Sequence, residues 1–272
     1  MIWAIVQQVG GQAASYAVFF LLAAILRPED FGIVGMASAW IGLLGAFAEI
    51  GFGAAIVQRA EVRSEHLSTT FAINLAGGLI LALAGVLLAW GAADFFDTPA
   101  VGPVMAALSL GFVIRAISLA QAAYAQRELR FRALAVRDIG ASAVGGLVGV
   151  GMALGGWGVW SLVGMTLVNN AAGAILIWRT TDWRPRWREV SLARARELWP
   201  FSSRILGFNI LKALVQNVDR LVIGFVLGAG ALGIYTFAWR VVVFPVRVLS
   251  SALGAYLFPK ASRLQHDHPA VR

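Results

Sequence analysis

Five basic residues lie deep within apolar stretches of the sequence, where charged side chains are rare. They are Arg115, Lys212, Arg220, Arg240 and Arg247. A charge at the centre of a bilayer costs about 2.5–3.5 kcal/mol on insertion scales, so it normally faces a partner or a watery cavity. Because the planar guanidinium of arginine matches phosphate oxygens, a cavity with net positive charge would suit a phosphate-bearing molecule. We interpret the five as candidate substrate-binding residues.

Other polar side chains recur near these charges at helical spacing. Steps of three or four residues place side chains on one face of a helix. Such steps link Lys212 to Arg220, and they give four separate apolar segments a polar stripe. We expect these stripes to line one groove. The residues expected to line it besides the five basic ones are Gln8, Gln12, Asn209, Gln216, Asp219 and Glu49.

Only Glu49 and Asp219 place an acid well inside an apolar segment. At 1.5 Å of rise per residue, Asp219 and Arg240 lie at similar depths on consecutive helices, so they could form a salt bridge. In one interpretation Asp219 merely neutralises a neighbouring arginine, and the basic residues are structural. In the other, the remaining positive charge binds substrate.

The elements that must position these residues are membrane-spanning helices. The chain has 272 residues, of which 59% are hydrophobic and 13% charged, whereas soluble domains average about a quarter charged. Crossing the hydrocarbon core takes about 20 apolar residues. The sequence therefore predicts an all-α polytopic membrane protein with about eight spans. Their predicted ranges are 3–26, 31–57, 67–90, 101–124, 138–156, 157–178, 201–227 and 231–258.

The charges in the connecting segments predict the orientation. The loops after the first, third, fifth and seventh spans hold only Arg27, whereas the other loops and the tail hold fifteen Lys and Arg residues. Because basic loops stay in the cytoplasm, we expect a cytoplasmic N-terminus. The net charge of +8 is then a topology signal, and we expect no nucleic-acid partner.

An internal repeat divides the predicted spans into two groups. Leu26, Phe31, Gly32 and Ile33 recur 201 residues later, in each case between two spans. An offset of six helices gives repeats in parallel orientation, related by an axis along the membrane normal. We expect one whole lobe and two helices of the next, as in a piece of a longer protein. The predicted divisions are a six-helix lobe at 1–178, a basic cytoplasmic linker at 179–200, the first two helices of a second lobe at 201–258 and a tail at 259–272.

An ordered set of motifs resembles the Wzx-like polysaccharide transporter family, within the superfamily that includes lipid II flippases and MATE exporters. The matching segments are LRPEDFG at 26–32, EIGFGAAIVQ at 49–58, QRELRFRA at 126–133, NVDRLVIG at 217–224, LGIY at 232–235 and FPKASRL at 258–264. The resemblance implies a flippase of the bacterial cytoplasmic membrane. Its substrate would be an undecaprenyl-pyrophosphate-linked oligosaccharide for lipopolysaccharide or exopolysaccharide synthesis. Its partners would be that lipid-linked saccharide, the bilayer and other polysaccharide assembly proteins.

Two other functions remain open. A MATE-like, cation-coupled exporter of small molecules would need a buried carboxylate in the first lobe, for which Glu49 is the candidate. A membrane glycosyltransferase or polymerase would need paired carboxylates or metal ligands beside a large loop. The linker offers Asp182, Glu189 and Glu197 among six arginines, and the chain has no cysteine. We therefore predict a non-enzyme without catalytic residues, metal ligands or cofactor.

Overall fold

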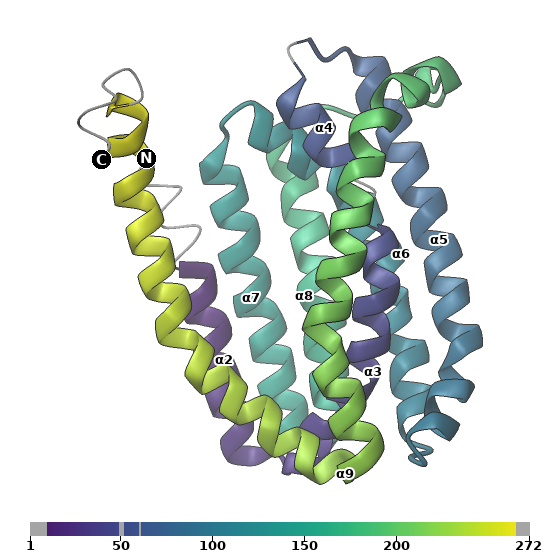
Figure 1. The fold of residues 1–272 in the computed structure, drawn as a ribbon, viewed down its shortest axis with the longest axis vertical. Coiled ribbons are helices and arrows are strands. Elements are labelled where there is room, and N and C mark those ends of the chain that lie inside the picture. The colour runs from purple at the N-terminus through teal and green to yellow at the C-terminus, as the bar shows by residue number, and fades with distance from the viewer. Residues whose placement is uncertain (1–9, 49–51, 60, 265–272) are drawn as a thin grey trace.

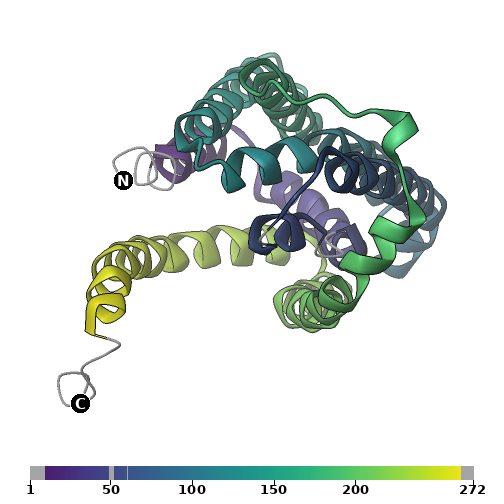
Figure 2. The same cartoon turned by 90° about the horizontal axis from the view of Figure 1, so that it is seen from above.

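The computed structural model describes residues 10–48, 52–59 and 61–264, with side chains described as far as Val243 except at 198, 201 and 204. In this part of the chain, long helices run side by side (Figure 1), and the view from above looks along the bundle (Figure 2). The helices are α2 (Gly11–Ile25), α3 (Pro28–Ala48), α4 (Phe52–Gln58), α5 (Ser64–Phe95), α6 (Val101–Arg127), α7 (Phe131–Leu154), α8 (Val159–Thr180), the short 3₁₀ helix η2 (Trp187–Glu189) and α9 (Leu192–Leu264).

Six helices of the described residues are long and apolar enough to cross a membrane: α3, α5, α6, α7, α8 and the 205–243 part of α9. α9 bends at Gly228, whose φ of 80° lies outside the helical region. Its two parts, 192–227 and 229–264, therefore run as separate helices, and α2 adds a shorter apolar helix. The predicted all-α, multi-pass membrane fold is confirmed, and the count agrees with the eight expected spans.

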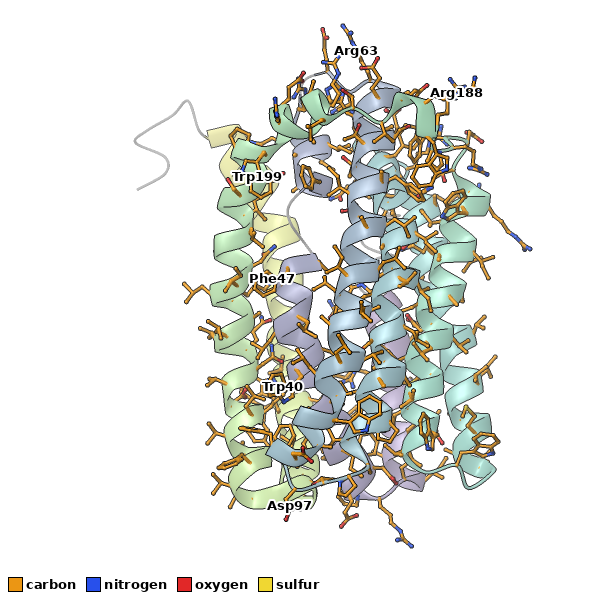
Figure 3. All side chains as sticks on the ribbon, turned by 90° about the vertical axis from the view of Figure 1, so that its right-hand side faces the viewer. Trp40, Phe47, Arg63, Asp97, Arg188 and Trp199 are labelled. Atoms are coloured by element: carbon orange, nitrogen blue, oxygen red, sulfur yellow. The ribbon has the colours of Figure 1, made fainter. Side chains whose placement is uncertain are left out.

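The turns at one end of the bundle use residues suited to sharp chain reversal. Pro28 opens α3, where its missing N–H costs nothing. The Asp30 carboxylate accepts a hydrogen bond from the backbone N–H of Arg27 at 3.1 Å. Gly156 and Gly158, with φ of 79° and 52°, turn the chain between α7 and α8. These turns, the Asp97 turn and the bend at Gly228 lie at the same end of the molecule (Figures 1 and 3).

The arginine-rich segments gather at the other end, which we call the basic end. Figure 3 shows Arg63 and Arg188 there and Asp97 at the far end. The segment from Thr181 to Ser191 lies against the start of α5: the Arg186 N–H donates to Ser68 and the Ser191 N–H donates to Thr69. Segregation of the basic loops to one end is what the predicted orientation requires.

Small residues bring the helices close together. A Cβ on Gly145 of α7 would lie 2.8 Å from the Met165 carbonyl oxygen of α8, and one on Gly149 would lie 2.8 Å from Met165 Cβ. Helix association in lipid relies on such close packing, because lipid tails are as apolar as the side chains. Large apolar side chains such as Leu87 and Leu147 point outward instead, 70% and 75% exposed.

Two predicted ranges can be set beside the described helices. Within the span predicted at 31–57, the structure describes α3 as far as Ala48 and α4 from Phe52. Within the linker predicted at 179–200, α9 begins at Leu192 and continues into the following span.

Candidate functional site

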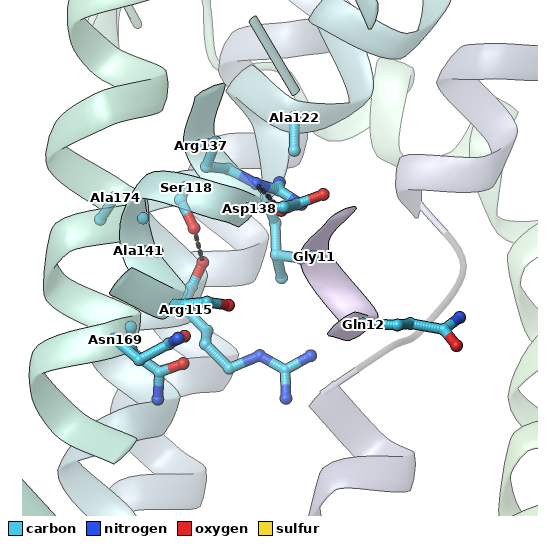
Figure 4. Close-up of a pocket in the computed structure, with 14 residues that line it drawn as sticks. Gly11, Gln12, Arg115, Ser118, Ala122, Arg137, Asp138, Ala141, Asn169 and Ala174 are labelled. Atoms are coloured by element: carbon cyan, nitrogen blue, oxygen red, sulfur yellow. Dashed lines mark hydrogen bonds and ion pairs between the residues drawn. The ribbon is translucent and has the colours of Figure 1, made fainter. Parts of the chain in front are cut away.

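A polar cavity of about 480 Å³ opens between α2, α6, α7 and α8. Figure 4 shows the Arg115 side chain extending from α6 into the space between Asn169 of α8 and the α2 segment that carries Gln12. Arg137 and Asp138, at the same site, bond to each other, with Arg137 Nε donating to Asp138 Oδ1 at 2.7 Å. We call this space cavity A.

A second cavity, cavity B, of about 400 Å³, lies between α2, α3, α8 and both parts of α9. Its walls combine two arginines, Arg220 and Arg240, with aromatic rings. The Arg240 guanidinium carbon lies 4.2 Å from the centre of the Phe19 ring, a cation–π geometry. Arg240 Nη2 also lies 3.4 Å from Ser15 Oγ.

A smaller cavity of about 200 Å³ lies between A and B. It shares Asn169 and Asn170 with cavity A and Thr166 and Arg240 with cavity B. Thr166, Asn169, Asn170 and Gly173 follow the i, i+3, i+4, i+7 spacing, so one face of α8 borders all three cavities. We call the three adjoining cavities the polar track.

The polar track is cationic. Its described lining residues include four arginines (Arg115, Arg137, Arg220 and Arg240) and one acid, Asp138, which gives four positive charges and one negative. Because the track lies among helices that are apolar enough to span a membrane, an anion within it would be attracted strongly.

The structure brings together four residues that the sequence predicted from different helices. Gln12 and Arg115 line cavity A, and Arg220 and Arg240 line cavity B. Lys212 and Gln216 do not join them. Both are exposed, because α9 turns Asn217 and Gly224 toward α3 instead.

The remaining predicted residues are placed as follows. Asn209 is half-buried. Arg247 lies in α9 beyond the described side chains, and Gln8 and Glu49 lie outside the described residues. Asp219 accepts a hydrogen bond from Tyr235 Oη at 2.5 Å and another from the Arg220 backbone N–H at 2.8 Å. The structure thus gives Asp219 and Arg240 separate contacts, and their salt bridge stays a prediction.

The residues expected from the sequence to line the groove did not include Asn169, Asn170, Ser142 or Thr166. The signal was present in part: Thr166, Asn169 and Asn170 form a polar stripe at helical spacing within an otherwise apolar helix. Asp138 and Arg137 were missed because they stand at the edge of a span, where charges are ordinary.

Comparison with known proteins gives the family. The model of a family described as "Polysaccharide biosynthesis protein" matches residues 21–272. The chain is 27% identical to the succinoglycan biosynthesis transport protein ExoT of Rhizobium meliloti, over 97% of this chain and 53% of that protein. It is 29% identical to the lipopolysaccharide biosynthesis protein WzxC of Escherichia coli, over 93% of this chain and 51% of that protein.

A third relative, the teichuronic acid biosynthesis protein TuaB of Bacillus subtilis, is 24% identical over 82% of this chain and 47% of its own length. The chain spans about half the length of the curated relatives that it matches. No solved structure matches it. The resemblance found in the sequence motifs is confirmed, and the chain belongs to the polysaccharide biosynthesis protein family.

Proposed function

We propose that this chain forms part of a flippase that moves an undecaprenyl-pyrophosphate-linked oligosaccharide across the bacterial cytoplasmic membrane for lipopolysaccharide or exopolysaccharide synthesis. The observation that carries the proposal is the polar track, whose adjoining cavities extend from Arg115 to Arg240 within an otherwise apolar bundle. The N-terminus and the basic end face the cytoplasm, and the two repeats give alternating access to the track.

The charge of the track supports a phosphate-bearing substrate. A pyrophosphate cannot enter hydrocarbon without a large cost, and fixed guanidinium groups replace part of its lost hydration. The three positive charges in excess on the described lining favour anionic over cationic cargo. The names of the relatives, two of which refer to transport or lipopolysaccharide biosynthesis, agree with this class.

The alternative is a MATE-like exporter of cationic small molecules. That function needs a carboxylate that the cargo or coupling ion can reach. Asp138, the acid that the described part of the track contains, is engaged by Arg137 at 2.7 Å. Glu49, the carboxylate expected to serve this function, lies outside the described residues. The excess of arginine on the described lining is what argues against a cationic cargo.

The test compares substitutions inside the track with one outside it, each of which removes one positive charge. In the full-length protein reconstituted into vesicles, Arg115→Gln and Arg240→Gln should reduce translocation of a fluorescent lipid-linked saccharide. Lys212→Gln removes the same charge from an exposed position on α9 and is the matched control. Equal translocation by all three variants and the unmodified protein would exclude the track as the path. Loss of activity only in Lys212→Gln would place the site elsewhere.

A further inference from the structure

The two copies of the sequence repeat touch each other in the folded chain. The first copy lies where α2 turns into α3, and the second lies at the bend of α9. At the repeat offset of 201 residues, Pro28 corresponds to Ala229 and Gly32 corresponds to Gly233. Figure 1 shows the α2–α3 turn and the bend of α9 at the end of the molecule away from the basic loops.

The contact between the copies is reciprocal. A Cβ added to Gly32 would overlap the carbonyl oxygen of Ala229, and a Cβ added to Gly233 would overlap the carbonyl oxygen of Pro28. Gly32 meets Ala229, and Gly233 meets Pro28. Because Ala229 is the repeat counterpart of Pro28, the two contacts are equivalent. Reciprocal contacts of this kind are the signature of a two-fold axis, here relating the two copies of the repeat within one chain.

Two further pairs locate this pseudo-two-fold axis. Gly35 and Thr236 correspond at the same offset, and a Cβ on Gly35 would lie 3.5 Å from Thr236 Oγ1. Glu29 and Gly230 also correspond, and a Cβ on Gly230 would lie 3.7 Å from Glu29 Oε1. A residue that touches its own counterpart lies at the axis. The axis therefore passes between the first turns of α3 and of the 229–264 part of α9.

Cavity B begins immediately beside this crossing. The α3 residues that line it are Phe31, Val34, Gly35 and Ser38. The 229–264 part of α9 contributes Thr236, Trp239, Arg240 and Val243, and the part before the bend contributes Arg220. α3 and the 229–264 part of α9 both run from the crossing toward the basic end, so the cavity lies on the basic-end side of the crossing. Thr236 Oγ1, beside the axis, is buried without a hydrogen-bond partner among the described residues.

We infer that the Gly32–Gly233 crossing is the closure of the polar track at the end opposite the basic loops, and that the two repeats part here to let cargo leave. The inference rests on the proposed function in that the track is a transport path, and it adds the residues that seal it. Glycine is required at both positions because the obstructing atoms are backbone carbonyl oxygens, which cannot rotate away as a side chain could.

A methyl group at either position would penalise the closed arrangement and leave the parted one unaffected. Because the methyl group raises the free energy of the closed state and not of the parted state, it shifts the population toward the parted state. Gly91 is a matched control, because a Cβ there meets nothing within 4 Å and the residue lies near the same end of α5. Gly32→Ala and Gly233→Ala should act alike, because the two contacts are equivalent.

The experiment uses the absence of cysteine from the chain. A single cysteine replaces Thr166 in cavity B, and a membrane-impermeant thiol reagent is applied from the side that labels a Thr98→Cys reference. Gly32→Ala and Gly233→Ala should each raise the labelling rate at position 166 several-fold, and Gly91→Ala should leave it unchanged. Unchanged labelling in both inserted variants would overturn the inference.

A second measurement keeps Gly32 and Gly233, in case an alanine variant fails to insert. Cysteines at Glu29 and Gly230 are joined as a disulfide by mild oxidation, which leaves the lone Thr166→Cys reporter as a thiol, and labelling of the reporter is then followed from the same side. Cross-linking should slow the labelling, and an equal rate before and after would overturn the inference. Neither labelling experiment needs a saccharide. If the labelling rates change as expected but the translocation assay fails, the proposed substrate is wrong and the gate inference stands.

Discussion

Glu197 Oε2 lies 2.6 Å from Arg59 Nη2, which ties the second turn of α9 to the segment after α4. The same carboxylate group bonds Arg194 at 2.7 Å, and His66 Nε2 lies 3.4 Å from it. Arg194 in turn bonds Glu65 of α5 at 2.8 Å. We call these five residues the linker cluster. It holds the segment between α8 and the next span against the basic end.

Glu197→Gln should loosen the linker, because the amide keeps the shape of the side chain but loses its charge toward Arg59 and Arg194. Trypsin should then cut at Arg194 and Arg196 faster than in the unmodified protein. Glu61→Gln, an exposed change of the same type at the same end, is the control and should leave the rate unchanged. Equal cleavage of both variants would show that the cluster does not hold the linker.

Acid should release the linker within a defined range. The hydrogen bond from Arg194, followed by that from His66, lowers the pKa of Glu197 from 4.5 to about 2. A carboxylate whose pKa is lower in the folded state contributes stability that is complete above its unfolded pKa and is lost as the pH falls through the folded one. The mobility of a spin label at Ala193→Cys should therefore be constant from pH 7 to about 5 and rise between about 4.5 and 2. In Glu197→Gln the mobility should be high throughout, and an unchanged transition would contradict this assignment.

Arginine in the track should be only partly replaceable by lysine. Lysine keeps the charge but lacks the planar fork that bonds two phosphate oxygens and stacks on Phe19. Charge-assisted hydrogen bonds contribute about 1.5–3 kcal/mol, so Arg240→Gln should lower translocation by roughly 10–100-fold. Arg240→Lys should fall between this variant and the unmodified protein. A lysine variant as impaired as the glutamine variant would show that geometry alone matters at this position.

The contacts of Asp219 predict how it responds to mutation. If Asp219 and Arg240 were a structural ion pair, Arg240→Gln would strand the acid, and adding Asp219→Asn would restore stability and export. The structure instead bonds Asp219 to Tyr235 and to the Arg220 backbone. We therefore expect no rescue by the double change, and a lower thermal unfolding temperature for Tyr235→Phe. Full rescue would establish the ion pair.

The predicted orientation is open to direct test. A membrane-impermeant thiol reagent added to intact cells should label Thr98→Cys but not Ser64→Cys or Ala133→Cys. Permeabilised cells should show labelling at all three positions, which controls for reactivity. Labelling of position 64 or 133 in intact cells would reverse the orientation proposed from the basic loops.

The sequence by itself determined the spans, the segregation of charge and the repeat. Runs of about 20 apolar residues must be helical in lipid, because each backbone N–H and C=O has to be bonded within its own segment. The asymmetry between Arg27 and the fifteen basic residues of the other loops marked one end of the bundle. The offset between Gly32 and Gly233 was readable in the same way, since it needs only the order of the residues.

The tertiary structure decided which stripes meet. Helical spacing placed Lys212, Gln216 and Arg220 on one side of a helix, but only Arg220 reaches the track, whereas Lys212 and Gln216 are exposed. Periodicity cannot say which way a face points when both lipid and neighbouring helices are apolar. Small residues decide it instead: Gly42 lets Asn217 approach to within 2.8 Å of a would-be Cβ, which fixes the rotation of α9 against α3. The same packing places Gly32 against the backbone of Ala229 and Gly233 against that of Pro28. This contact joins backbones about 200 residues apart in the sequence, so no local pattern predicts it.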